Sequence, residues 1–195
     1  MKKGTRVQCL IIAVVSLAVA LTLTMFAEAA EFSADMVQKA AGQTWGGKVF
    51  VKGTKMRMEM NTPAGASITI TLPDEGKTLM LQPANKMYME MTMETPTENA
   101  AMMEKELEKI ATRKLSGTET VSGYECDKYE IVYHDTSMGT MTQWFSKKLK
   151  FPVKMIYHGA NGEVITEYKN IKESNVPEVM FQVPTGYQKM NLPGM

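Results

Sequence analysis

The sequence contains few of the residues that supply nucleophiles, general bases and zinc ligands. It has two cysteines and two histidines among 195 residues. Cys126 is the only cysteine beyond the N-terminal apolar run, so it has no internal disulfide partner, and we expect a small buried side chain there. His134 and His158 stand at the ends of expected strands, where a solvated histidine is usual. A strand of eight residues spans about 26 Å, so Cys126 and His134 cannot act as a nucleophile and base pair.

The motifs of the common catalytic and phosphate-binding sites are also missing. The sequence has no Gly-x-Ser-x-Gly, His-Glu-x-x-His or Cys-x-x-Cys motif, and no glycine loop of the kind that holds a phosphate. We therefore expect a protein that is not an enzyme, with no catalytic residues and no cofactor.

Neither sign of charge is in excess. The net charge at pH 7 is +1, and three of the 22 Lys and Arg residues and one of the 21 Asp and Glu residues fall within residues 1–29. The rest of the chain is therefore nearly neutral. Binding to nucleic acid requires a clear basic surface, so we expect no nucleic-acid partner.

Long apolar runs are absent beyond the N-terminus. There, basic residues precede an apolar run at residues 10–23, and the small residues Ala27 and Ala29 follow it. This order predicts a secretory signal peptide over residues 1–29. The run is shorter than the roughly 20 residues of a membrane span, although an uncleaved anchor is the alternative. We expect residues 30–195 to form a single periplasmic domain with no stable membrane span.

What the sequence has in excess is methionine, with 19 residues. Many of them occupy every second position in two runs, and this alternation predicts two strands that each have one thioether face. The residues are Met56, Met58 and Met60 in the first run and Met87, Met89, Met91 and Met93 in the second. Methionine is a weaker strand former than valine or isoleucine, but its flexible side chain can repack around different apolar ligands.

Three interpretations of this methionine face remain open. It is a packed core beneath a helix, or it binds an acyl chain or another apolar ligand, or its thioethers bind Cu(I), which is a soft ion. Neighbouring methionines on one strand place their sulfurs about 6.6 Å apart. That spacing argues against copper held by two neighbours of a single run.

Turn signals divide most of the chain into short strands. Residues 48–94 read as an antiparallel meander, and strands resume after residue 112 and continue to Ile171. Between them, Thr95-Pro96-Thr97-Glu98 has the form of a capping box and predicts a helix that ends near residue 110. Its apolar stripe is expected to lie on the methionine face as a lid. The lid residues are Met103, Leu107 and Ile110.

The two tryptophans are further candidate ligand-binding residues. Trp45 stands beside two glycines and Trp144 precedes Phe145. Both could line the mouth of a cavity, or each could be a core or rim aromatic.

Several short motifs carry a family resemblance. They are Trp144-Phe145, Phe151-Pro152-Val153, Asn161-Gly162, Tyr168-Lys169-Asn170-Ile171 and Met180-Phe181-Gln182-Val183-Pro184-Thr185-Gly186-Tyr187. In this order, after a meander and a capped helix, they resemble the periplasmic lipoprotein carriers of the LolA and LolB type. The resemblance is closer still to a related Met-rich family of exported proteins. It implies an incomplete barrel, a curved antiparallel sheet of about eleven strands whose concave face is covered by helices and holds acyl chains.

Together these observations predict a mainly β exported protein that binds or carries a lipid-like ligand, such as a lipid or a lipoprotein acyl chain, in a methionine-lined concavity under a helical lid. The alternative is an envelope structural, interaction or sensor protein whose concavity is filled by its own side chains and which docks another envelope protein. A periplasmic Cu(I)-binding protein is the minor alternative.

Overall fold

The computed structural model describes residues 30–62, 65–92 and 108–190. These residues form one sheet of 12 strands in the order β12-β6-β5-β4-β3-β2-β1-β11-β10-β9-β8-β7. The strands are β1 (Glu31–Ala40), β2 (Gln43–Lys52), β3 (Lys55–Thr62), β4 (Gly65–Leu72), β5 (Lys77–Gln82), β6 (Met87–Thr92), β7 (Ala111–Val121), β8 (Tyr124–Tyr133), β9 (Thr140–Ser146), β10 (Phe151–Gly159), β11 (Gly162–Glu173) and β12 (Gln188–Lys189). The expected curved antiparallel sheet is confirmed.

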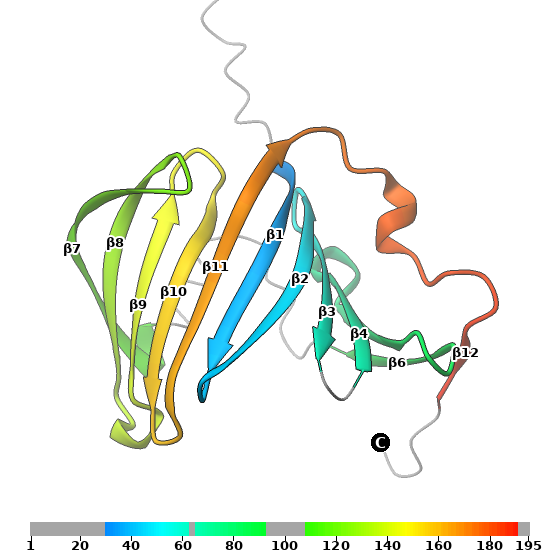
Figure 1. Ribbon diagram of the computed structural model, residues 1–195, viewed down its shortest axis with the longest axis horizontal. Helices are drawn as coiled ribbons and strands as arrows, with labels where there is room; N and C mark the ends of the chain where they lie inside the picture. The colour runs from blue at the N-terminus through cyan, green and yellow to red at the C-terminus, as the bar shows by residue number, and fades with distance from the viewer. Residues whose placement is uncertain (1–29, 63–64, 93–107, 191–195) are drawn as a thin grey trace, which may run out of the picture.

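The sheet consists of two meanders joined along one pair of strands. Strands β1 to β6 follow one another in space as in sequence, and so do β7 to β11, while β1 pairs with β11 to join the two halves. The sheet curls strongly but stays open, with β7 and β12 as its two edges (Figure 1). All pairs are antiparallel except the short pairing of β12 with β6.

The turns follow the chemistry of their residues. The 3-10 turn Pro73–Glu75 ends at Gly76, whose positive φ of 59° lets its N–H reach the carbonyl of Pro73. The expected hairpin at Asn161-Gly162 joins β10 to β11, with Gly159 opposite Gly162. Short turns of this kind leave consecutive strands no alternative to antiparallel pairing.

The expected helical lid is not supported by the described residues. Most of the helix, including Met103 and Leu107, lies outside them. Glu108, Lys109 and Ile110 are helical, but all three side chains are exposed, and Ile110 is 50% exposed. The Ile110 carbonyl accepts the His134 N–H just before β7 begins, so the helical segment ends at Ile110, and the placement of this residue on the methionine face stays a prediction. The other helical segments among the described residues are the short 3-10 turns Pro73–Glu75, Thr136–Met138 and Glu178–Phe181.

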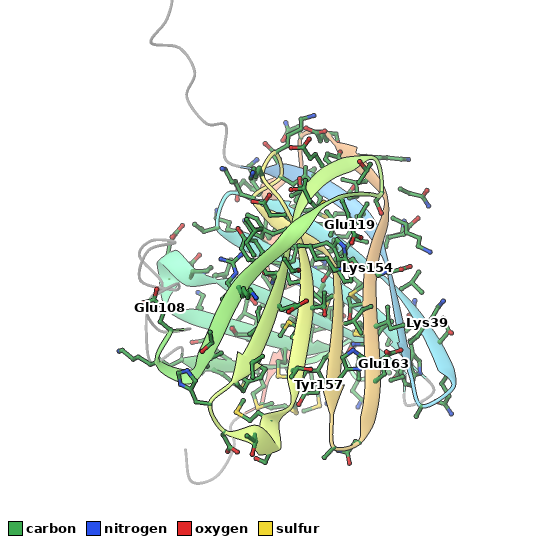
Figure 2. The ribbon with its side chains drawn as sticks, turned by 90° about the vertical axis from the view of Figure 1, so that its left-hand side faces the viewer. Lys39, Glu108, Glu119, Lys154, Tyr157 and Glu163 are labelled. Atoms are coloured by element: carbon green, nitrogen blue, oxygen red, sulfur yellow. The ribbon has the colours of Figure 1, made fainter. Side chains whose placement is uncertain are left out.

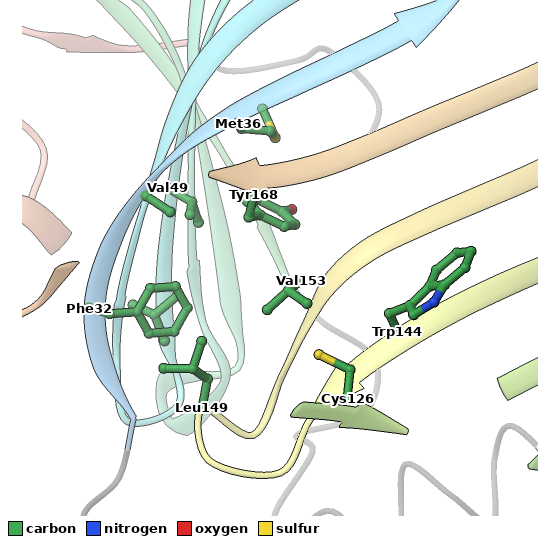
Figure 3. Packing of buried hydrophobic residues seen from close by; sticks show 10 residues of the cluster. Phe32, Met36, Val49, Cys126, Trp144, Leu149, Val153 and Tyr168 are labelled. Atoms are coloured by element: carbon green, nitrogen blue, oxygen red, sulfur yellow. The ribbon is translucent and has the colours of Figure 1, made fainter. Parts of the chain in front are cut away.

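One hydrophobic cluster fills one end of the curled sheet. Phe32 on β1 contacts the Phe151 ring edge-on at 5.2 Å, and Phe151 contacts Tyr168 in the same way at 5.0 Å. Figure 3 shows Phe32, Leu149 and Val153 pointing into the space between β1 and the β9–β10 turn. This end of the half-barrel is therefore closed by the protein's own side chains.

A second cluster lies on the opposite, outer face of β4 and β5. The C-terminal segment, residues 174–190, crosses this face and places Val176 and Phe181 on it. The strand residues beneath are Ile70, Leu72, Leu79 and Leu81. The final motif of the family resemblance, Met180 to Tyr187, is therefore part of the structure that covers the outer face.

Candidate functional site: the concave face of the sheet

The methionines of both runs lie on the same face of the sheet. Residues directly opposite on paired strands point to the same side, so the register can be followed from strand to strand. Met58 stands opposite Val49 on β2 in one direction and Thr69 on β4 in the other, and the same row continues to Met80 on β5 and Met89 on β6. The rows above and below connect Met56 with Met91 and Met60 with Met87. The predicted thioether face is thus one surface, apart from Met93, which lies outside the described residues.

This surface is the inner, concave side of the sheet. Val49 and Val51 stand opposite Met58 and Met56, and Phe32 stands opposite Val51. Phe32 also belongs to the cluster enclosed by the curl (Figure 3). The methionine face is therefore continuous with the packed end of the half-barrel.

The sulfurs form two groups separated by a polar strand. Ser67, Thr69 and Thr71 of β4 lie between the first methionine run on β3 and the side chains of β5. Met80 belongs to the second group but lies outside both runs, and sequence analysis missed it. The only available signal was the alternation of Thr78, Met80 and Gln82 along the same strand.

The methionine side chains are only partly covered. Met80 is 40% exposed and Met91 is 38% exposed, and the other methionines of the two runs within the described residues are half-buried. Fully packed core side chains such as Phe32 and Val49 show 0% exposure. The face is thus accessible where it passes from β3 to β6 and closed where it reaches β1.

The two tryptophans differ in burial. Trp45 stands opposite Gln38 and shares the parity of Val49 on β2, so it lies half-buried on the concave face. Trp144 stands opposite Lys128 and Lys154, is 6% exposed, and belongs to the same hydrophobic cluster as Phe32 and Val153 (Figure 3). Of the two roles left open by the sequence, its burial in this cluster favours that of a core aromatic, and a role at the mouth of a cavity stays a prediction.

Trp144 is held by charged side chains. Its ring centroid lies 5.1 Å from Lys128 Nζ and 5.0 Å from Lys154 Nζ, and its Nε1 donates to Glu119 Oε2 at 2.7 Å. Two of these partners, Glu119 and Lys154, are labelled in Figure 2. The Lys128 ammonium, followed by the Trp144 indole N–H, holds the pKa of Glu119 below its usual value. Cation–π and hydrogen-bond contacts of this kind stabilise a buried tryptophan on a charged surface.

The other half of the concave face is aromatic and contains a cation. Arg113 of β7 stands opposite Ile131, and its guanidinium carbon lies 3.5 Å from the centroid of the Tyr129 ring. Tyr157 shares this face, and its hydroxyl donates to the Met138 carbonyl at 2.6 Å. Sequence analysis did not single out these residues, because scattered aromatics on separate strands show no shared face until the strands are paired.

Arg57 points away from the methionines, as the alternation predicts, but it is buried. It is 7% exposed, its Nη1 donates to the Met180 carbonyl at 3.0 Å, and its Nε pairs with Glu59 Oε1 at 2.7 Å. Lys55 adds an exposed ion pair to Glu178 at 2.8 Å. These contacts attach the C-terminal segment to the outer face of β3.

Replacing Arg57 by leucine is expected to lower the free energy of unfolding by about 2 kcal/mol, because the change removes a charge-assisted hydrogen bond and leaves Glu59 unpaired. Urea denaturation measures this loss. Lys55→Leu is the matched control and should cost less than about 1 kcal/mol, since its ion pair is exposed. Equal losses in both variants would show that burial of Arg57 is unimportant.

Other candidate sites among the described residues are few. Two hollows, of about 520 and 530 Å³, lie at the β7–β8 turn with Lys147, Lys148 and Glu173, and beside β1 with Lys48 and Phe50. No group of three or more histidine, cysteine, aspartate or glutamate side chains in the described part of the chain could hold a metal ion. No helix there is both long and apolar enough to cross a membrane.

The geometry defines a class: an open half-barrel with a partly covered apolar concave face. The chain belongs to the family described as Domain of unknown function (DUF4412), whose model matches residues 33–150 and 140–187. No curated protein matches the sequence. The closer resemblance to a Met-rich exported family stays a prediction.

Solved structures share this fold at low sequence identity. An uncharacterized conserved protein of Thermus thermophilus matches with a TM-score of 0.61 and 11% identity over 90% of this chain and 98% of that one. A chain of the Pseudomonas aeruginosa MucA/MucB complex matches with a TM-score of 0.56 and 10% identity over 85% of this chain and 60% of that one. A LolA superfamily protein of Nitrosomonas europaea, NE2245, matches over 79% and 90% at 11% identity, but its TM-score of 0.37 is too low to carry an argument. These similarities concern the fold alone.

Proposed function

We propose that the protein is exported to the periplasm and binds a lipid-like apolar ligand, such as the acyl chain of a lipid or lipoprotein, on its concave face. The observation that carries this proposal is the accessibility of the methionine face. Met80 and Met91 remain 40% and 38% exposed on a surface that is otherwise lined by thioethers and hydroxyls. A side chain placed only for stability would be packed as tightly as Phe32.

The energetics of carriage fit a concave apolar surface. Each methylene kept from water contributes about 0.8 kcal/mol, so an acyl chain of about a dozen carbons needs a surface that supplies on the order of 10 kcal/mol. A curled sheet can surround a chain on several sides, whereas a flat patch cannot. Methionine side chains adapt to chains of different length because they have three rotatable bonds and no branch.

The two halves of the concave face suggest an orientation for the ligand. The methionines of β3 to β6 suit the acyl chain. Arg113 and the tyrosines of β7 to β10 suit a polar headgroup, since a guanidinium and phenols offer hydrogen-bond donors. The packed cluster at Phe32 limits the depth of the concavity at one end.

Binding can be tested on protein purified from its own host. Native mass spectrometry and solvent extraction should detect an acyl lipid that co-purifies in near-stoichiometric amount. Protein stripped of lipid should then enhance the emission of an environment-sensitive fluorescent fatty acid, with saturation at one or two ligands per chain. A preparation without lipid that also fails to bind the fluorescent fatty acid would contradict the proposal.

A second candidate function is docking of another envelope protein. The packed end of the half-barrel favours it, because Phe32, Leu149 and Val153 fill part of the space that a ligand would otherwise occupy. One structure with this fold is a complex of MucB with MucA, so the fold accommodates a protein partner. Lipid-free protein with a high melting temperature would favour this alternative.

A further inference from the structure

Four methionines are gathered on two adjacent strands of the concave face. Met80 of β5 stands directly opposite Met89 of β6, and Met87 and Met91 flank Met89 on the same strand and the same side. The residues opposite those two flanks are Gln82 and Thr78. On this face, the three opposed pairs of β5 and β6 therefore contain four thioethers, two neutral polar side chains and no charged side chain.

The pairing places the methionines close enough for side-chain rotation to bring their sulfurs to ligand distance. Residues directly opposite on antiparallel strands have Cβ atoms about 4.5–5.5 Å apart, and diagonal neighbours lie about 7–8 Å apart. A metal–sulfur bond of about 2.3 Å sets the sulfurs of one site roughly 4 Å from each other. The three rotatable bonds of methionine can close the remaining difference.

The first methionine run does not have this property. Met58 on β3 stands between Val49 and Thr69, and Met56 stands between Val51 and Thr71. Sulfurs on that strand meet only their own neighbours, at about 6.6 Å along the chain. The two groups of methionines are thus chemically different although they share one face.

We propose that Met80, Met89 and Met91 bind one Cu(I) ion, with Met87 available as a fourth ligand. Neutral thioethers are soft donors that select Cu(I) over Zn²⁺, Ca²⁺ and Mg²⁺, which prefer imidazole, thiolate or oxygen ligands. The exposed fractions of Met80 and Met91, 40% and 38%, leave the site open to an ion from solvent. The site overlaps the β5–β6 part of the face proposed for the lipid, but Cu(I) binding does not require a lipid and is measured on protein stripped of lipid.

The test uses the full exported protein and Cu(I) itself. Under anaerobic, reducing conditions the protein competes with a chromogenic Cu(I) chelator, and X-ray absorption identifies the ligand atoms. We expect one ion per chain, sulfur scatterers only, and at least tenfold weaker binding in the double variant Met80→Leu/Met89→Leu. The matched control Met56→Leu/Met58→Leu, on the same face but without opposed thioethers, should change the affinity less than twofold.

Three results would overturn the proposal: no binding by the wild-type protein, equal weakening in both double variants, or nitrogen and oxygen scatterers around the copper. Leucine has nearly the volume of methionine, so both double variants should fold, and a thermal melt confirms it. If the Met80→Leu/Met89→Leu protein is unstable, the single variant Met89→Leu replaces it, with the same expected weakening of Cu(I) binding. Excess Zn²⁺ should not displace Cu(I) from the protein.

Discussion

Replacing Phe32 by alanine is expected to lower the free energy of unfolding by about 4 kcal/mol, the range measured when a buried phenylalanine is truncated and leaves a cavity. Phe32 is 0% exposed and its ring contacts Phe151 edge-on at 5.2 Å. Phe151 in turn contacts Tyr168, so the lost ring is one of three in mutual contact. Urea denaturation followed by tryptophan fluorescence measures the loss.

Leu115→Ala is the control for this prediction. Leu115 is 55% exposed on the edge strand β7, and its truncation should cost less than about 0.5 kcal/mol. If Phe32→Ala costs no more than Leu115→Ala, the enclosed cluster is not the packed end of the half-barrel. The folded fraction of Phe32→Ala should still bind the fluorescent fatty acid, because Phe32 lies outside the accessible part of the face.

The alternation of residue types was sufficient to predict the strands and their faces locally. In the stretch from Lys55 to Met60, the methionines point to one side and the charged residues to the other, as period two requires. The hairpins followed from turn residues such as Asn161-Gly162. These features depend on neighbours within a few residues, which the sequence displays directly.

The features that were missed depend on distant residues. The pairing of β1 with β11 joins Met36 to Tyr168, and no local pattern indicates it. The alternation is consistent with Arg57 on the outer side, but its burial requires the C-terminal segment, which contributes the Met180 carbonyl. Long-range contacts of this kind decide which charged side chains are buried, and single-sequence patterns do not contain them.

Trp144 and Ile110 show two limits of sequence patterns. Trp144 and Phe145 are adjacent aromatic residues, so the sequence could not indicate that Trp144 is buried in the cluster with Phe32, and the register shift between Pro152 and Lys154 on the paired strand disturbs the alternation there. Ile110 fitted the apolar stripe of the expected helix, but the chain enters β7 directly after it. This element boundary leaves Ile110 at the very end of the helical segment, where its side chain is exposed.

A second large effect is expected on the affinity of the proposed ligand face for a fatty acid. Introducing a charge in its central row, with Met58→Glu, is expected to weaken binding of the fluorescent fatty acid at least a hundredfold. A carboxylate covered by an acyl chain loses its hydration without gaining a partner, at a cost of several kcal/mol. Met58 is half-buried in the free protein, so the new carboxylate stays in contact with water there. The change should therefore reduce the affinity for the fatty acid more than it reduces the stability of the fold.

Thr44→Glu provides the matched control. Thr44 is exposed on β2, and its parity places it on the outer face, opposite to Val49 and the methionines. The Thr44→Glu variant adds the same charge to the same sheet as Met58→Glu, so it tests whether net charge alone affects binding. We expect its affinity for the fatty acid to stay within twofold of the wild-type value.

Undiminished binding by Met58→Glu would place the ligand elsewhere, whereas loss in both variants would point to repulsion of the ligand's own carboxylate. A neutral fluorescent diacylglycerol then separates these two explanations, since it should bind Thr44→Glu normally and Met58→Glu poorly only if the acyl chain lies on the concave face.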